Sequence, residues 1–172
     1  MLDVVTPAGL RSVEDFDEAV ALWESANVGW RVALLPRDRQ SDIDGFLIDP
    51  LGDVAAVIEG KCRYGITLDD FRTTFGNSWL VTMDKLVRGA AVARSLRVPF
   101  VGFLYIAADG VLLTRRLADE DGTFAAPFEC RRTTTQKSIN GGVADRANAF
   151  IDMTDCREYR RSGCQENRQS SL

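Results

Sequence analysis

Two carboxylates and an ammonium lie within one short segment of the chain. Asp44, Glu59 and Lys61 stand at the polar ends of two apolar runs that are joined by the turn Pro50–Asp53. Proline, glycine and aspartate at these positions favour a β-hairpin. If these four residues form the turn, the pairing that follows places Asp44 directly opposite Glu59.

Side chains alternate along a strand, so Asp44, Glu59 and Lys61 would share one face of the hairpin. Opposed like charges about 5 Å apart are destabilising, and at the end of an apolar face they should share a proton or hold a cation. Carboxylate oxygens suit a hard ion, Mg²⁺ or Mn²⁺, and Lys61 would stabilise negative charge or orient a water. The spacing leaves a second interpretation open, in which Lys61 neutralises Asp42 or Glu59 and Asp44 lies in solvent.

The apolar periodicity predicts the elements that position these residues. In chain order they are a helix over 12–27, strands over 30–36, 43–49 and 54–63, a short helix over 67–74, a segment over 78–99 that begins extended and becomes a helix, two apolar runs over 100–117, a strand-like or irregular stretch over 124–140 and a final helix over 143–153. Both faces of the middle strands are apolar, which indicates a sheet covered on both sides. We therefore predict an α/β fold with a helix, three strands, a helix and one or two further strands.

The composition fits one globular domain, which we place at residues 1–155, followed by a tail at 156–172 that is poor in apolar residues and predicted to be disordered. The net charge is −4, so the whole molecule is not a basic nucleic-acid binder. The chain has 18 Arg and three Lys. This excess of arginine reflects either phosphate recognition or codon supply in a GC-rich genome.

Metal sites built on cysteine and membrane insertion are not expected. The four cysteines form no CxxC pair and histidine is absent, so the spacing does not indicate a zinc site. No run of about 18 apolar residues exists, and the acidic N-terminal stretch lacks the features of a secretory signal. We expect a cytoplasmic protein without membrane contact.

The segment DGFLIDPLGDVAAVIEGK, residues 44–61, resembles the core motif of the PD-(D/E)xK nuclease superfamily, which has the restriction-endonuclease-like fold. The predicted order of elements over 12–108 is similar to the αβββαβ core of that fold, a mixed central sheet with helices on both faces. The helix that contains TMDKLVRG after the motif is similar to small bacteriophage members. Ile43 stands immediately before Asp44, so the leading proline of the family motif is absent.

The resemblance implies a nuclease that hydrolyses phosphodiester bonds in DNA with Mg²⁺ or Mn²⁺. Asp44 and Glu59 would bind the ion with help from the carbonyl of Gly60, and Lys61 would position or activate the attacking water. Candidates for additional site residues are Glu18 (or Glu14) on the first helix, Lys85 and Gln136. Candidates for contact with nucleic acid are Arg63, Arg131, Arg132 and Lys137. Each of these side chains has an ordinary alternative as a solvated surface charge or part of a surface loop.

The resemblance also bears on partners and location. Many relatives self-associate to cut two strands, so a homo-oligomer is compatible with it. The phage-like members suggest a bacterial cell or a phage-infected host. Two alternatives stay open: a catalytically inactive nuclease-like module that binds DNA or protein and has a regulatory role, and an unrelated α/β domain in which 42–63 is only a charged hairpin.

Overall fold

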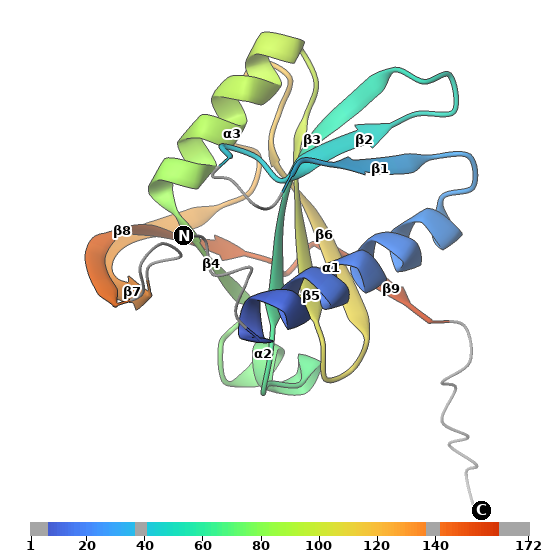
Figure 1. Cartoon of the computed structure of the whole chain (residues 1–172). Coiled ribbons are helices and arrows are strands. Elements are labelled where there is room, and N and C mark those ends of the chain that lie inside the picture. Colours follow the sequence, from blue (N-terminus) through green and yellow to red (C-terminus); the bar gives the residue numbers. More distant parts are fainter. Residues whose placement is uncertain (1–6, 37–40, 137–141, 162–172) are drawn as a thin grey trace, which may run out of the picture.

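The computed structural model describes residues 7–36, 41–136 and 142–161. It contains a large sheet, a small sheet and three helices, with more strand than helix (Figure 1). No described helix has the length and apolar character that crossing a membrane requires.

The large sheet has six strands in the order β1-β2-β3-β5-β6-β9. They are β1 (Arg31–Leu34), β2 (Gly45–Ile48), β3 (Val54–Arg63), β5 (Phe100–Ile106), β6 (Val111–Ala118) and β9 (Arg157–Arg160). The central pair β3 and β5 is parallel and the other pairs are antiparallel. The predicted mixed sheet within an α/β fold is therefore confirmed.

Two long helices cover opposite faces of this sheet (Figure 1). Helix α1 (Pro7–Ala26) packs through Phe16 and Trp23 onto one face, in a cluster with Ile58 and Phe103. Helix α3 (Met83–Leu96) packs through a second set of residues onto the other face. That set comprises Leu86, Ala90 and Ala93, which contact a cluster containing Val57 and Phe100. Because Val57 and Ile58 are consecutive in β3, the period-two alternation of the strand supplies both cores.

A small sheet lies beside α3, in the order β4-β8-β7. Its strands are β4 (Ser78–Thr82), β8 (Val143–Asp152) and β7 (Phe128–Gln136), and the short helix α2 (Leu68–Thr73) precedes it. The predicted final helix over 143–153 is wrong, because this segment is β8. Its backbone pairs with β4 on one side and β7 on the other, and this pairing outweighs the helix propensity of its alanines.

The C-terminal segment also differs from expectation. Residues 157–160 were predicted to belong to a disordered tail, but they form β9 and pair with β6. Tyr159 is buried in the cluster under α1, and this one aromatic side chain anchors a segment that is otherwise charged. Residues 162–172 lie outside the described part of the chain.

The β2–β3 hairpin has the predicted register over most of its length. Gly45 pairs with Ile58 and Phe46 pairs with Val57. A bulge between Leu47 and Ile48 then shifts the pairing by one residue near the turn. The bulge lies at the far end of the hairpin from the acidic residues, so it leaves their relative position unchanged.

Candidate metal centre

Asp44 lies immediately before β2 and is held there by backbone bonds on both sides. Its amide donates to the carbonyl of Ile58 (2.9 Å), and its carbonyl accepts from the amide of Leu35 (2.9 Å). Its side-chain Oδ2 accepts from the amide of Gly60 (2.7 Å). These bonds direct the Asp44 carboxylate along β3 toward the position of Glu59.

Lys85 joins Asp44 and Glu59. Its Nζ donates to Asp44 Oδ1 (3.2 Å) and to Glu59 Oε2 (3.0 Å). The two carboxylates therefore converge on one cation, which comes from the first turn of α3. Thr82 positions this turn, because its side chain accepts from the Lys85 amide as the N-cap of the helix.

Glu59 is the most buried member of this group. Its side chain is 11% exposed, against 33% for Asp44 and 31% for Lys85. Burial and then the nearby Asp44 charge raise the pKa of Glu59 to about 8, although Lys85 partly opposes this shift. Burial alone would lower the pKa of Lys85, but the charges of Glu59 and Asp44 outweigh it and the pKa is raised.

The raised pKa of Glu59 predicts a specific dependence of stability on pH. The folded protein keeps a proton on Glu59 from the ordinary value of 4.5 up to about 8, whereas the unfolded chain has released it. The free energy of unfolding should therefore fall as pH rises through this window. Chemical denaturation across the window should show a steeper fall for the wild type than for Glu59→Gln, by at least about 1.4 kcal/mol, the equivalent of one pKa unit. Parallel curves for the two proteins would contradict the prediction.

Lys61 follows Glu59 by two positions in β3 and lies on the same face, toward α3. The residue as a whole is exposed, yet the protein around its ammonium lowers the pKa of Lys61 through loss of solvation and then through the charge of Arg63. Arg63 continues the same face and is partly buried. A cationic edge thus extends from the carboxylates toward the end of β3.

Gly60, between Glu59 and Lys61, faces the opposite side of the sheet. A Cβ atom on Gly60 would lie 2.0 Å from Cζ of Phe16 in α1, so only glycine fits here. Its amide points to Asp44. N–H and C=O of one strand residue point to the same neighbour, so its carbonyl lies on the same edge of β3.

Glu18 lies apart from this group. Its Oε2 accepts from the hydroxyl of Tyr105 (2.6 Å), within the packing of α1, and its other oxygen pairs with Arg161. Helix α1 covers the face opposite to Glu59, so the structure does not bring Glu18 to the carboxylate pair. Gln136 ends β7, but its side chain is outside what the structure describes, and Lys137 is outside the described residues altogether.

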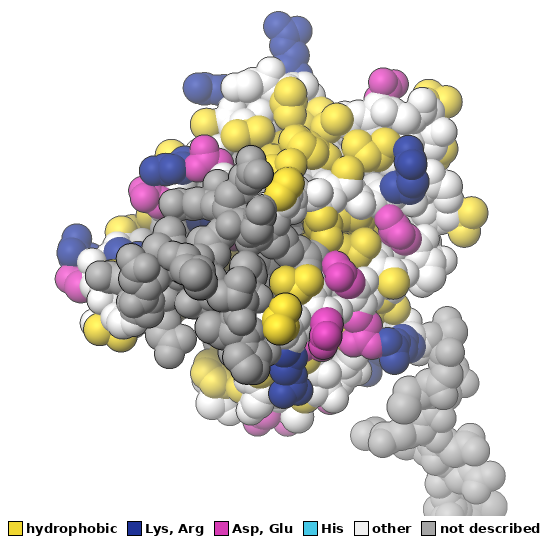
Figure 2. Space-filling model, in the orientation of Figure 1, with side chains coloured by type: hydrophobic (Ala, Val, Ile, Leu, Met, Phe, Trp, Pro, Cys, Tyr) yellow, Lys and Arg dark blue, Asp and Glu magenta, His cyan; other side chains and the backbone are white. Residues whose placement is uncertain are grey.

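The arginines proposed for nucleic-acid contact on β7 lie in the small sheet and have acidic partners. Arg131 donates to Glu129 (2.6 Å from Nε) and also packs on the ring of Phe150. Arg132 donates to Asp145 (3.0 Å). On the face shown in Figure 2, most basic side chains of the described residues lie next to acidic ones, and those at the top of the view stand apart. These acidic partners offset the positive charge that the two arginines would present to a phosphate.

The Asp44 and Glu59 carboxylates converge on the ammonium of Lys85, so they lie close enough to share one cation. Two carboxylates, with the Gly60 carbonyl near them, suit a hard divalent ion that takes its remaining ligands from water and substrate. Within the described parts of the chain, no group of three or more His, Cys, Asp or Glu side chains gathers in a metal-binding arrangement. Two carboxylates alone would leave most of the ligand positions of such an ion to water or to other oxygen ligands.

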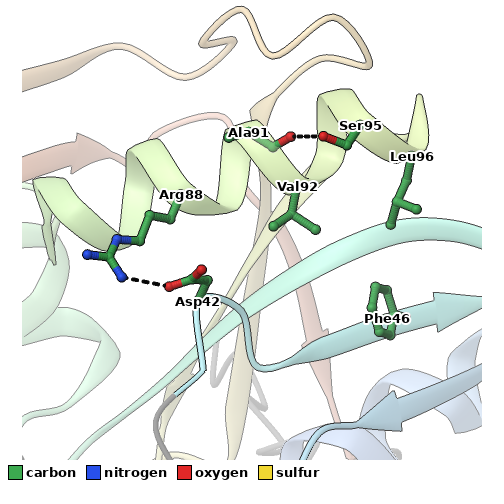
Figure 3. Close-up of a pocket in the computed structure, with 7 residues that line it drawn as sticks. All are labelled: Asp42, Phe46, Arg88, Ala91, Val92, Ser95 and Leu96. Carbon is green, nitrogen blue, oxygen red and sulfur yellow. Dashed lines mark hydrogen bonds and ion pairs between the residues drawn. The ribbon is translucent and has the colours of Figure 1, made fainter.

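A separate groove of about 470 Å³ lies between α3 and β2 (Figure 3). Its walls are mainly apolar, with Phe46, Val92 and Leu96 facing one another, and the ion pair of Arg88 with Asp42 (2.9 Å) closes one end. The carboxylate pair does not line it. An apolar groove does not suit a phosphate backbone, so it is distinct from the candidate metal centre.

Thr82 was missed as a residue that supports the site. The sequence signal for Thr82 was a threonine directly before a helix, three positions ahead of Lys85.

Comparison of the chain with protein-family models, with curated proteins and with solved structures gave no match.

Proposed function

We propose that the protein is a divalent-metal-dependent nuclease of the PD-(D/E)xK type that hydrolyses phosphodiester bonds in DNA. The observation that carries this proposal is the convergence of the Asp44 and Glu59 carboxylates on one cation, with Lys61 next along the same strand face.

The arrangement of elements supports the proposal. Helix α1, strands β1 to β3, helix α3 and strand β5 follow one another in the order of the restriction-endonuclease-like core, with α2 and β4 between β3 and α3. The acidic residues lie at the end of the β2–β3 hairpin, and β5 runs parallel to β3.

Each residue has a distinct role in the proposed reaction. Asp44 and Glu59 hold Mg²⁺ or Mn²⁺ with the Gly60 carbonyl, and the bound ion lowers the pKa of water and neutralises developing charge. Lys61 contacts the attacking water or a phosphate oxygen. Burial and then the charge of Arg63 lower the pKa of Lys61, which is the direction that a role in proton transfer requires.

The proposed partner is DNA, approached locally by the cationic edge of Lys61 and Arg63 rather than by a broad basic surface. Affinity for DNA depends on the number of phosphates neutralised, and the net charge of −4 favours weak nonspecific binding by one copy. In a homo-oligomer, the carboxylate site of a second copy would act on the other strand of the DNA. The proposed location is the cytoplasm of a bacterium or of a phage-infected host.

A second candidate function is a nuclease-like module that binds DNA or protein and has no catalytic activity. The position of Lys85 favours it, since an ammonium between the carboxylates already offsets part of their charge without an ion. A regulatory module would keep this arrangement permanently.

The test is cleavage of linear, nicked, single-stranded and branched DNA with Mg²⁺, Mn²⁺ or EDTA. We expect cutting only with a divalent ion, and a loss of at least about a hundredfold in Asp44→Asn. Asparagine retains an acceptor for the Gly60 amide, so the fold should survive. Asp42→Asn is the matched control, because Asp42 pairs with the exposed Arg88 outside the carboxylate pair and its loss should leave the rate unchanged. If the folded wild type cuts none of the substrates, the module without activity is the better description.

A further inference from the structure

Lys85 occupies an unfavourable place for a cation on its own helix. It lies in the first turn of α3, where the helix dipole favours acidic side chains and opposes positive charge. Its two carboxylate partners offset this, and both belong to the β2–β3 hairpin. The Lys85 ammonium is thus held by the hairpin, not by its own helix.

The ammonium uses one oxygen of each carboxylate, and these are two of the oxygens that a divalent ion between Asp44 and Glu59 would use. It bonds Asp44 Oδ1 and Glu59 Oε2, while the other Asp44 oxygen is taken by the Gly60 amide. An ion and the ammonium together would bring three positive charges to two carboxylates. Simultaneous occupation of this position is therefore opposed by both geometry and charge.

The Lys85 side chain can leave the carboxylates for solvent. Its side chain is 31% exposed, so the ammonium can swing into water without being buried unpaired. The hydrogen bond from the Lys85 amide to Thr82 fixes only the backbone. Movement of this side chain requires no rearrangement of α3.

We propose that the Lys85 ammonium and a divalent ion occupy the same position between Asp44 and Glu59 in exclusion of one another, so that Lys85 sets the affinity of the site for the ion. The inference rests on the proposed function, because it assumes that the carboxylate pair is a metal site. The Lys85 ammonium competes with other cations for the two carboxylates, and the divalent ion binds by displacing it.

The first experiment is calorimetric titration of the whole chain with Mn²⁺, without DNA and under anaerobic conditions, at a pH above the pKa of Glu59. We expect Lys85→Met to bind Mn²⁺ about tenfold more tightly than the wild type, because the competitor is gone. Lys85→Arg retains a competing cation and should stay near the wild type. Arg88→Met is the matched control, since it removes a cation from the next turn of α3 that pairs with Asp42 and Asp84 instead.

A second measurement uses the unaltered protein and does not depend on the folding of a variant. The chain has only three lysines, so the side-chain NMR signals of lysine can be assigned one by one. Titration with diamagnetic Mg²⁺ should shift the Lys85 signals with the same midpoint as ion binding.

The outcomes separate this inference from the proposed function. Tighter Mn²⁺ binding by Lys85→Met supports the inference. It does so even if the wild type binds no Mn²⁺ and cuts no DNA, a result that would overturn the proposed nuclease function but not the competition between Lys85 and the ion. The inference would be overturned if Lys85→Met bound Mn²⁺ equally or more weakly, or if the Lys85 signals stayed fixed while Mg²⁺ saturated the site. Neither result would contradict the proposed nuclease function. Absence of binding to both proteins at millimolar Mn²⁺ would overturn both.

Discussion

Replacing Lys61 by methionine is expected to lower the rate of DNA cleavage by about a thousandfold, within the range for loss of a group that acts on a proton or a developing charge. Mn²⁺ affinity should stay within about twofold of the wild type, because metal binding is assigned to Asp44, Glu59 and the Gly60 carbonyl. Lys61 is exposed, so methionine should not disturb the core. Cleavage rate and Mn²⁺ titration, measured on the same preparation, test both parts.

The control for Lys61 is Arg160→Met. Arg160 lies in the edge strand β9, where it pairs with Glu158, and its loss changes the net charge equally. Its rate should match the wild type. Equal losses in both variants would assign the effect to general charge and remove Lys61 from the reaction.

Replacing Gly60 by alanine is expected to lower the free energy of unfolding by about 2–3 kcal/mol, the upper part of the range for overpacking. The added Cβ would lie 2.0 Å from the Phe16 ring, so α1 must shift or the ring must leave its position. Phe16 is 7% exposed, which leaves it little room. Urea denaturation of the variant measures the loss.

A double variant tests whether Phe16 is the cause. Phe16→Leu alone should also destabilise the protein, but Gly60→Ala should cost much less in that background than in the wild type. Costs that simply add would show that the methyl group is harmful for another reason. The motif position between Glu59 and Lys61 is therefore a packing constraint as well as part of the candidate site.

Local sequence signals predicted the part of the fold that carries the site. The turn Pro50–Asp53 and the alternation of apolar residues specified the β2–β3 register up to the bulge at Leu47. Proximity of Asp44 to Glu59 follows from that register alone, because both residues belong to one hairpin.

Long-range pairing was not predictable in the same way. The segment 143–153 has helix-forming residues, and only its position between β4 and β7 makes it a strand. Glu18 was a candidate because of its place in the first helix, but the face that α1 covers is decided by Phe16 and Trp23. Lys85 was a candidate on a helix, and its contact with both carboxylates depends on how α3 packs across β3.

The contact between Asp44 and Glu59 forms within one hairpin, whereas their contacts with Lys85 join segments that are farther apart in the sequence. This difference has a consequence for the order of folding. Hairpins close in about 1–10 μs, whereas a parallel pair such as β3 and β5 must wait for its crossover to be ordered. Asp44 and Glu59 therefore meet before α3 delivers Lys85. Until α3 packs across β3, Glu59 lies in water with an ordinary pKa, so the packing of α3 brings both the burial that raises this pKa and the ammonium of Lys85.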